Sequence, residues 1–533
     1  MKVVKTSYDN ITAISKFDLQ FLKSDQVLKK YYAYTSDLDG IKQAILNKKS
    51  NYKFRKQLSE ILKRQHANTE DSRVLEAIHT LKHDNCFCVT AAHQPCLFGG
   101  PAYFIYKIAS TIHLANTLTH HFPEYKFVPV FYLGSEDHDF EEINHLNLFN
   151  NRIVWQKENH SGASGRLTTE GLTDVVQTIL NLFENQTEKR EILNILLNTS
   201  LHEQTYNLVI KHFIYQLFGE YGLVVVDPDD VELKRLMIPA FKDELLNQTS
   251  SKLLQTTISQ LESDKVKVQA RGREINLFYL RDNLRERIVM ENGLFRALNT
   301  EYCFTASEME SELQNHPERF SPNVILRPLF QESILPNVAF VGGGGEIAYW
   351  TELKPIFEYH TVQYPVLIRR NSVAIIDITT LNRLTKAGIE VSDLQYPFEK
   401  IEQDYLRKNS EMLDFSEYEK SINTILEQMY DMVQIYDQNS TGRLMADKNM
   451  MVNKITEWEK KLNKQIILKH ETKLNQMKSA YEKIFPGQNL QERTDSCIWL
   501  IAHFGTEIIS FLVHNLNPLD RQFMYLVQQP DVE

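Results

Sequence analysis

Residues 86–140 carry the pattern that most restricts how this chain can fold. A short apolar run at 86–91 ends in a glycine-containing loop, and Pro101 then begins a segment whose apolar residues recur at helical spacing. Proline is favoured in the first turn of a helix because its missing N–H would be unpaired there anyway. A second apolar run follows at 127–133. Strand, helix and strand in this order predict a βαβ unit, and therefore a parallel sheet with a right-handed crossover.

Further strand-like runs predict that the same sheet resumes after an insertion. These runs lie at 223–227, 324–330, 337–341 and 365–369. Strands that alternate with helical segments are typical of α/β proteins, in which ligands bind beyond the carboxyl ends of the parallel strands. The predicted fold class is therefore α/β, with helices over residues 1 to about 82 ahead of the first strand.

Residues 378–486 differ in character from the predicted core. Ile422, Ile425, Met429 and Met432 follow one another at intervals of three and four, and the same pattern returns after a polar break at 438–443. Apolar positions with this spacing predict two long amphipathic helices. We expect these helices to pair as an antiparallel coiled-coil arm.

The composition excludes several functional classes. The formal net charge is −10, whereas nonspecific nucleic-acid binding needs a basic face, so no nucleic-acid partner is predicted. Five cysteines in 533 residues indicate a reducing compartment. The N-terminus lacks the apolar segment of a signal peptide, and the apolar stretch 497–513 contains His503 and Glu507. A cytoplasmic protein with no membrane span is therefore expected.

A run of four glycines, Gly342, Gly343, Gly344 and Gly345, follows a predicted strand and precedes a predicted helix. Glycine lets a ligand approach backbone N–H groups, and a helix start directs those groups at an anion. The run matches neither the dinucleotide-binding nor the P-loop pattern. We therefore predict an anion site of another type. Glu346 is either a partner of the helix dipole or an acceptor for a substrate ammonium group.

The loop Glu136-Asp137-His138-Asp139 follows the second strand of the βαβ unit. A histidine beside carboxylates is typical of a general base, which gives His138, Asp137 and Asp139 candidate catalytic roles. A metal site and a solvated turn are the alternatives. Because the sequence has no HxxxH or HExxH spacing here, the general base is favoured and no metal is predicted.

Two further groups of residues are candidates for the site. His93 and Gln94 follow the first strand, where adenylating α/β enzymes place a histidine that contacts ATP phosphate, although HQPC is not HxGH. Arg327 and Arg369 each end a strand-like run. A guanidinium binds a carboxylate through two parallel hydrogen bonds, so both are candidates for clamping a carboxylate. Surface ion pairs are the alternative for each arginine.

Three segments resemble the bacillithiol biosynthesis cysteine-adding enzyme family. They are Val89–Ile108 with its HQPCLFGGPAYF motif, Pro129–His145 with YLGSEDHDFEEINH, and Phe320–Gln331 continued through Tyr349-Trp350. The resemblance covers essentially the whole chain. Two departures stand out: the family usually has Gly-Gln-Gln where this chain has Ala92-His93-Gln94, and a proline where it has Gly344.

The resemblance implies a Rossmann-like core with connecting-peptide insertions and a coiled-coil arm that forms homodimers. It implies a ligase that makes a C–N bond, joining L-cysteine to glucosaminyl-malate in the last step of bacillithiol biosynthesis. The malyl carboxylates would suit the glycine turn, Arg327 and Arg369, with Gln94, Glu346 and Tyr349 nearby. His138, with Asp137 or Asp139, would take the proton of the attacking amine, and His93 is a further catalytic candidate.

Amide formation in water is uphill, so the cysteine carboxyl needs activation. ATP, released as ADP or AMP, is the natural source, although the sequence carries no ATP fingerprint. Two other functions stay open: a nucleotidyl- or glycosyltransferase, and a non-catalytic coiled-coil scaffold. The predicted division of the chain is 1–150 (first half of the core), 151–300 (insertion, with a core strand near 223–227), 301–377 (second half of the core), 378–486 (arm) and 487–533 (segment packing on the core).

Overall fold

The computed structural model describes residues 1–69, 71–149, 151–158, 160–409 and 412–529. The chain divides into two compact units. We call the larger one the core unit; it comprises Ala13–Ala374 and Asn489–Met524. The smaller one, the arm unit, comprises Met1–Thr12, Ile375–Gln488 and Tyr525–Glu533.

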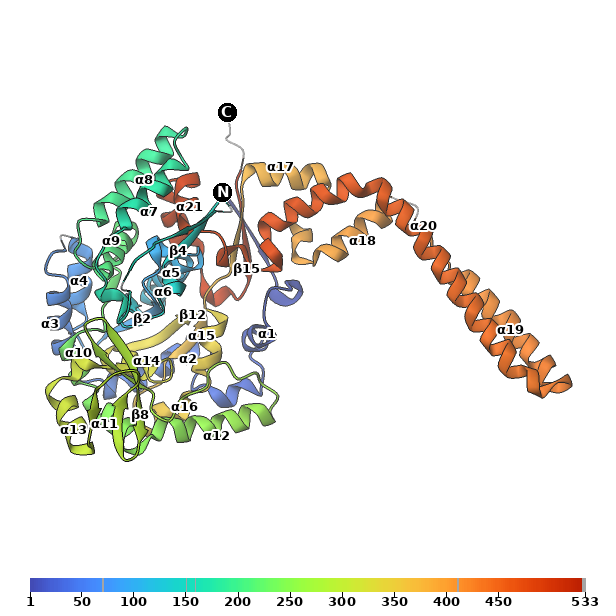
Figure 1. Ribbon diagram of the computed structural model, residues 1–533. Coiled ribbons are helices and arrows are strands. Elements are labelled where there is room, and N and C mark those ends of the chain that lie inside the picture. Colours follow the sequence, from blue (N-terminus) through green and yellow to red (C-terminus); the bar gives the residue numbers. More distant parts are fainter. Residues whose placement is uncertain (70, 150, 159, 410–411, 530–533) are drawn as a thin grey trace. The chain divides into compact units, whose positions relative to one another are not determined.

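A parallel sheet forms the centre of the core unit (Figure 1). Its strands are β2 (Cys86–His93), β3 (Lys126–Leu133), β6 (Val224–Val226), β12 (Asn337–Gly342) and β13 (Val366–Arg369). They lie side by side in the order β13-β12-β2-β3-β6, and every neighbouring pair is parallel. Along the chain, β2, β3 and β6 extend the sheet toward one edge. The later strands β12 and β13 then extend it from β2 toward the opposite edge. This reversal is the topological switch point of a Rossmann-like sheet, where such folds bind ligands.

Helices cover both faces of this sheet, which explains why its strands are continuous apolar runs. On one face, α2 (Leu38–Asn51) and α5 (Tyr103–His121) pack against side chains such as Phe87 and Val89. On the other face, α3 (Arg55–Gln65), α4 (Ser72–Thr80) and α14 (Arg327–Ile334) contribute to a larger core cluster that includes Val130 and Phe340. The α/β prediction is confirmed.

The insertion between β6 and β12 contains an antiparallel sheet ordered β10-β9-β8-β7-β11. Its strands are β7 (Leu277–Arg281), β8 (Leu284–Glu291), β9 (Leu294–Ala297), β10 (Cys303–Phe304) and β11 (Phe320–Pro322). The β8–β9 hairpin turns at Asn292 and Gly293, whose φ angles are 53° and 79°. An Asn-Gly pair favours such a turn because both residues tolerate positive φ.

Two predictions of secondary structure were wrong. The run at 324–330 was expected to be a strand, but α14 begins at Arg327, with Pro328 in its first turn. Leu326, Leu329 and Phe330 are buried at helical spacing, so the same apolar residues suit either element. The N-terminal segment was expected to be helical throughout, but it begins with β1 (Lys2–Thr6), which pairs with β15 (Phe523–Val527).

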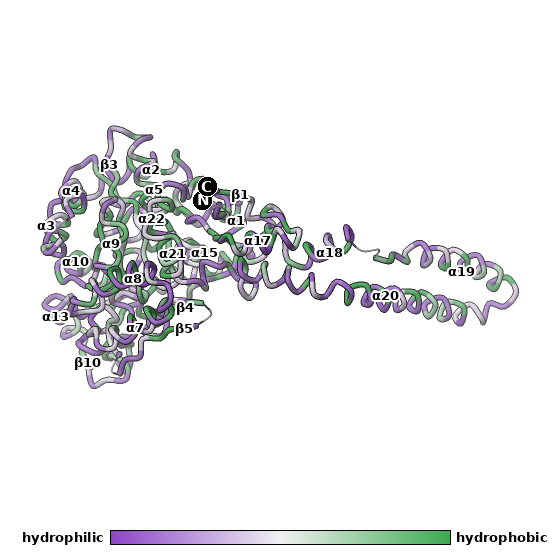
Figure 2. The backbone as a smooth tube through the Cα atoms, turned by 90° about the horizontal axis from the view of Figure 1, so that it is seen from above, coloured by the Kyte–Doolittle hydropathy of each residue, from purple (hydrophilic) through white to green (hydrophobic). Residues whose placement is uncertain are grey.

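Helices dominate the arm unit. They are α17 (Ile378–Ala387), α18 (Phe398–Asn409), α19 (Ser416–Tyr436) and α20 (Thr441–Ile484). Helices α19 and α20 lie side by side, with green apolar and purple polar residues alternating along both (Figures 1 and 2). Glu427 bonds Lys448 whereas Glu419 bonds Thr456, so the two helices run in opposite directions. The predicted antiparallel coiled-coil arm is confirmed.

Across the described ranges, no single helix has both the length and the apolar composition needed to cross a membrane. The consecutive helices α21 (Cys497–Phe504) and α22 (Glu507–Asn515) are together long and apolar enough, but their axes are bent by 112° relative to each other.

Candidate active site

A cavity of about 430 Å³ opens at the switch point of the parallel sheet. We call it the switch-point cavity. Its wall includes His93 at the end of β2, Asp137 after β3, Pro228 after β6, Gly343 after β12 and Arg370 after β13. Each of these residues follows the carboxyl end of a parallel strand, which is the edge where ligands were expected. The structure thus brings the histidine loop, the acidic loop and the glycine turn to one site.

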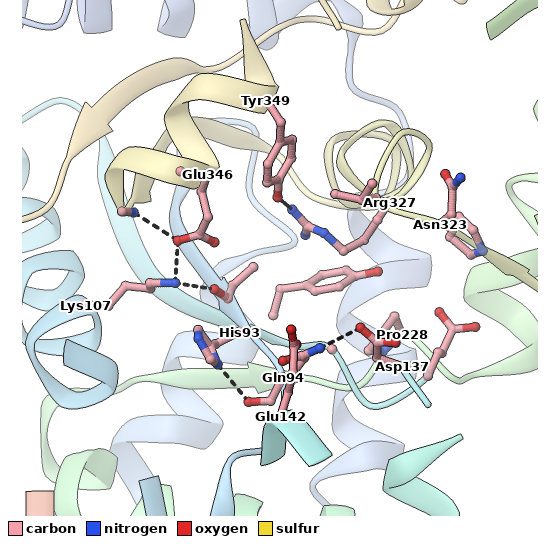
Figure 3. A pocket seen from close by; sticks show the side chains of 18 of the residues that line it. His93, Gln94, Lys107, Asp137, Glu142, Pro228, Asn323, Arg327, Glu346 and Tyr349 are labelled. Atoms are coloured by element: carbon pink, nitrogen blue, oxygen red, sulfur yellow. Dashed lines mark hydrogen bonds and ion pairs between the residues drawn. The ribbon is translucent and has the colours of Figure 1, made fainter. Parts of the chain in front are cut away.

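An ion pair between Lys107 and Glu346 spans one side of the cavity (Figure 3). The Lys107 ammonium, buried on α5, donates to the Glu346 carboxylate at 2.6 Å and to the Ala92 carbonyl at 2.8 Å. Burial by itself raises the pKa of Glu346, but the Lys107 charge and the hydrogen bonds from Lys107 and the Gly343 N–H together hold that pKa below its usual range. Glu346 is therefore a carboxylate that faces the cavity with its charge already balanced.

The glycine turn differs from the expected anion cradle. The Gly343 N–H donates to the Glu346 carboxylate at 2.9 Å, so one donor of the helix start is already satisfied. A Cβ at Gly344 would overlap the Asp18 carboxylate, and none of the four glycines has positive φ. Gly342 and Gly344 are therefore needed for space, whereas Gly343 and Gly345 leave room for a Cβ. The anion that the turn binds is the Glu346 carboxylate of the chain itself.

Arg369 binds the same internal carboxylate. Its Nε donates to Asp18 at 2.8 Å and its Nη2 donates to Ser372 at 3.1 Å. Arg369 is buried in β13 and does not belong to the cavity wall, whereas the next residue, Arg370, does. The carboxylate that Arg369 was predicted to clamp is therefore Asp18.

His93 is a neutral imidazole in the cavity wall. Its Nδ1 lies 3.1 Å from the Gln94 carbonyl and 3.5 Å from the Cys96 sulfur. Because the carbonyl is the nearer partner and only accepts hydrogen bonds, the contacts favour a proton on Nδ1 and a lone pair on Nε2. Burial, together with the Lys107 charge, lowers the pKa of His93 to about 4. The side chain is therefore unprotonated at neutral pH and offers one basic nitrogen.

The acidic loop contributes Glu136 and Asp137 to the cavity, whereas His138 and Asp139 lie outside its wall. Asp137 accepts from Gln94 Nε2 at 2.6 Å and from Arg285 Nη1 at 3.3 Å. Burial raises the pKa of Asp137, but bonds from His138, Arg285 and Gln94 bring it well below its usual range. His138 is exposed and bonds Arg285 at 2.7 Å, while Asp139 caps the short helix α6 (Phe140–Ile143). Neither lines the cavity.

Arg327 and Tyr349 face each other across another part of the cavity (Figure 3). Arg327 Nη2 donates to the Tyr349 hydroxyl at 2.8 Å, and Nη1 donates to Gln331 at 3.0 Å. The guanidinium lies 5.5 Å from the centre of the Tyr132 ring. Two predicted substrate-binding residues therefore meet here, with Arg327 delivered by a helix instead of the expected strand.

Several cavity residues escaped the sequence analysis. They include Tyr103, Lys107, Tyr132, Glu142, Gln269, Arg285, Asn323, Arg370 and Arg493. Only Lys107 could have been found from the sequence, because it is the one charged residue among the apolar residues that begin α5. A lysine in such a position needs a buried partner. Tyr103 and Tyr132 lie within the apolar runs of α5 and β3, and the remaining residues lie in loops, in short helices or on the insertion, so no periodic pattern singles them out.

Arg370 combines burial with a donor left unsatisfied. Its side chain is 2% exposed, and its terminal nitrogens donate to Glu492 and to the Asn371 carbonyl. Its Nε–H has no hydrogen-bond partner within the described residues.

Cationic side chains in the wall outnumber carboxylates by five to four, so the cavity suits an anionic ligand. In the described part of the chain, no cluster of three or more His, Cys, Asp or Glu is placed to hold a metal ion.

Two family models together match almost the whole sequence. The bacillithiol biosynthesis BshC N-terminal Rossmann-like domain matches residues 1–371, and the BshC C-terminal coiled-coil domain matches residues 373–528. Among curated relatives, a protein of Flavobacterium psychrophilum is 37% identical over 527 residues, which cover 97% of this chain and 98% of the relative.

Two further relatives agree with this match. One from Flavobacterium johnsoniae is 35% identical over 97% of this chain and 98% of its own length. One from Bacillus cereus is 26% identical over 92% and 94%, respectively. All three carry the name "Putative cysteine ligase BshC". The chain belongs to the bacillithiol biosynthesis BshC family.

Proposed function

We propose that this protein is a cysteine ligase that joins L-cysteine to glucosaminyl-malate through an amide bond, the last step of bacillithiol biosynthesis. The observation that carries the proposal is the presence of a neutral imidazole, His93, and a half-buried guanidinium, Arg327, in one cavity. The names of the relatives support the ligase assignment.

His93 is the residue best suited to take the proton of the sugar amine. The amine attacks the activated cysteine carboxyl and must lose a proton as the C–N bond forms. His93 Nε2 carries a lone pair because Nδ1 is bonded to a carbonyl. The Asp137 carboxylate is a much weaker base because Gln94 and Arg285 stabilise its charge. The general base therefore moves from His138, the earlier hypothesis, to His93.

Arg327 is the residue best placed to bind a malyl carboxylate. Its bonds to Tyr349 and Gln331 occupy two of the five N–H donors of a guanidinium. The remaining donors are available for a carboxylate, with which a guanidinium forms short, charge-assisted bonds. The glycine turn and Arg369 lose this role. The Gly343 N–H already bonds Glu346, and Arg369 is buried with bonds to Asp18, Ser372 and the Arg370 carbonyl.

Activation of the cysteine carboxyl is proposed to draw on ATP. The glycine turn gives no specific support for a nucleotide phosphate, because the Gly343 N–H already bonds the Glu346 carboxylate and the Asp18 carboxylate lies against Gly344. No step is therefore assigned to the turn, and the need for ATP is left to the assay.

The decisive experiment supplies purified protein with glucosaminyl-malate and L-cysteine, with and without ATP, and follows the thiol product by mass spectrometry. We expect product from the wild type, with a strong loss in His93→Gln. His138→Ala is the matched control and should stay close to wild type. Loss of product in His138→Ala with retention in His93→Gln would reverse the assignment of the base. A nucleotide-sugar bound in place of these substrates would favour a transferase.

The dimer predicted from the family resemblance also stays a proposal. We propose that the arm joins two copies of the chain, because α19 carries apolar side chains that stay exposed on its hairpin.

A further inference from the structure

A chain of buried hydrogen bonds leads from the core of the sheet to Arg327 in the switch-point cavity. Glu332 Oε1 accepts from Gln331 Nε2 at 2.9 Å, and Gln331 Oε1 accepts from Arg327 Nη1 at 3.0 Å. Gln331 and Glu332 are 0% and 1% exposed. Neither side chain lines the cavity, so any effect they have on a ligand must pass through Arg327.

Glu332 fixes which end of the Gln331 amide faces Arg327. A second donor, Asn337 Nδ2, lies 2.8 Å from the same Glu332 oxygen, and the Thr90 hydroxyl in β2 bonds the Asn337 oxygen at 2.9 Å. Because Glu332 Oε1 accepts, the Gln331 NH₂ must point to it and the Gln331 oxygen must point to Arg327. The reverse orientation would set the NH₂ group against a guanidinium, which only donates.

Protonation of Glu332 does not disturb this arrangement. Burial raises the pKa of Glu332 to about 7, and the nearby Lys48 ammonium partly offsets the rise. Oε1 already receives two N–H donors, so a proton would bind Oε2, which lies 3.9 Å from Lys48. The acceptor that orients Gln331 is present in both states.

Gln331 in turn limits how the guanidinium can rotate. Its bond holds Nη1, the Tyr349 hydroxyl holds Nη2 at 2.8 Å, and the Tyr132 ring lies beneath the plane. Two bonds at different nitrogens fix the direction of the donors that remain. A guanidinium that is oriented in advance loses less entropy when it binds a carboxylate.

We infer that Gln331 and Glu332 are positioning residues, which hold the Arg327 guanidinium in the orientation that binds the substrate carboxylate. This inference rests on the proposed function for the identity of the carboxylate. The orientation of Arg327 itself does not depend on it, so the two can be tested separately.

The kinetic test is a double-mutant cycle with Gln331→Met and Arg327→Met. Methionine keeps the length of glutamine and removes the acceptor. We expect Gln331→Met to raise KM for glucosaminyl-malate by roughly ten-fold or more, as for loss of a bond to a charged group, with a smaller change in kcat. If Gln331 acts through Arg327, the double variant should match Arg327→Met alone. Additive effects would overturn the inference.

The control variant is Ser333→Ala in the same helix. The Ser333 hydroxyl donates to the Leu329 carbonyl at 2.7 Å and has no bond to Arg327, Gln331 or Glu332. It should leave KM unchanged. Thermal unfolding of every variant identifies any that are not folded at the assay temperature, and an equal rise of KM in Ser333→Ala would mean that the effect is only structural.

A measurement without substrate separates the inference from the proposed function. The protein is labelled with ¹⁵N-arginine, and the Arg327 guanidinium resonances are assigned by their loss in Arg327→Met. Rotation about the Nε–Cζ bond should be several-fold faster in Gln331→Met than in the wild type or Ser333→Ala. Unchanged rotation would overturn the positioning role even if the ligase assay succeeds. Faster rotation in a protein that makes no product would support the positioning role and refute the proposed reaction.

Discussion

The Lys107 ammonium lies 2.6 Å from the Glu346 carboxylate, and this contact joins α5 to the helix α15 (Gly344–Trp350) across the switch point of the sheet. The same carboxylate caps α15 at the Gly343 N–H, so one side chain satisfies a buried cation and a helix start at once. Burial and the Lys107 charge keep His93 neutral because both oppose protonation of the imidazole, while the Glu346 charge offsets part of this effect on its pKa.

Lys107→Met should destabilise the protein because it leaves the Glu346 charge without its partner. Breaking a buried ion pair costs about 3–5 kcal/mol, and the 23% exposure of the Glu346 side chain places the expected loss near or below the lower figure. Urea unfolding measures this loss. The double variant Lys107→Met with Glu346→Gln should recover much of it, since no unpaired charge remains. Equal destabilisation in the single and double variants would contradict the ion-pair explanation.

Gly344→Ala should be strongly destabilising, whereas Gly345→Ala should not. A Cβ at 344 would overlap the Asp18 carboxylate, which Arg369 holds in place, and overpacking of this kind typically costs about 1–3 kcal/mol. The nearest atom to a Cβ at 345 is Gln269 Nε2 at 3.8 Å, an ordinary contact. Differential scanning calorimetry compares the two. A Gly344→Ala protein as stable as Gly345→Ala would show that the Asp18 carboxylate moves freely.

Stability should fall as the pH decreases from 7 to 5, and His93 should contribute to that fall. The pKa of His93 is about 4 in the folded protein and about 6.5 when unfolded, so only the unfolded state gains a proton in this window. Linkage gives about 2 kcal/mol lost between pH 7 and 5 for this histidine. His93→Gln should therefore lose less stability on acidification, as measured by urea titrations at both pH values. If the wild type and His93→Gln lose the same free energy of unfolding between pH 7 and 5, His93 must become protonated in the folded protein as readily as in the unfolded chain.

The strands of the parallel sheet could be predicted because each is buried on both faces and forms a continuous apolar run. The same rule failed at 324–330, where Leu326, Leu329 and Phe330 suit a buried helix equally well. The short strand β1 was also missed. It pairs with β15, more than 500 residues away in the sequence, and no local pattern reveals such a pairing.

The sequence predicted where the site lies on the sheet, but not all of the side chains that line it. Loops at the carboxyl ends of β2, β3 and β12 meet because parallel strands end at one edge. Which side chains turn inward depends on single positions. Successive residues of an extended segment face opposite sides, so Arg369 binds Asp18 while Arg370 lines the cavity. Asp18 lies in α1 (Lys16–Leu22), far from Arg369 in the sequence, and no motif links the two.

Met432→Lys should convert a dimer of this protein into a monomer. A stripe of apolar residues at heptad-like spacing stays exposed on α19 beside the α19–α20 contact: Ile425, Met429, Met432 and Tyr436, with exposed fractions of 55%, 40%, 57% and 88%. Such a stripe favours a further helix partner, and we propose that a second copy of the arm supplies it. A charge in the stripe would be buried without a partner. Sedimentation velocity should show the mass halved, while Gln434→Lys, an exposed polar position on the opposite side of α19, should leave the dimer intact. A monomeric wild type would refute the proposal.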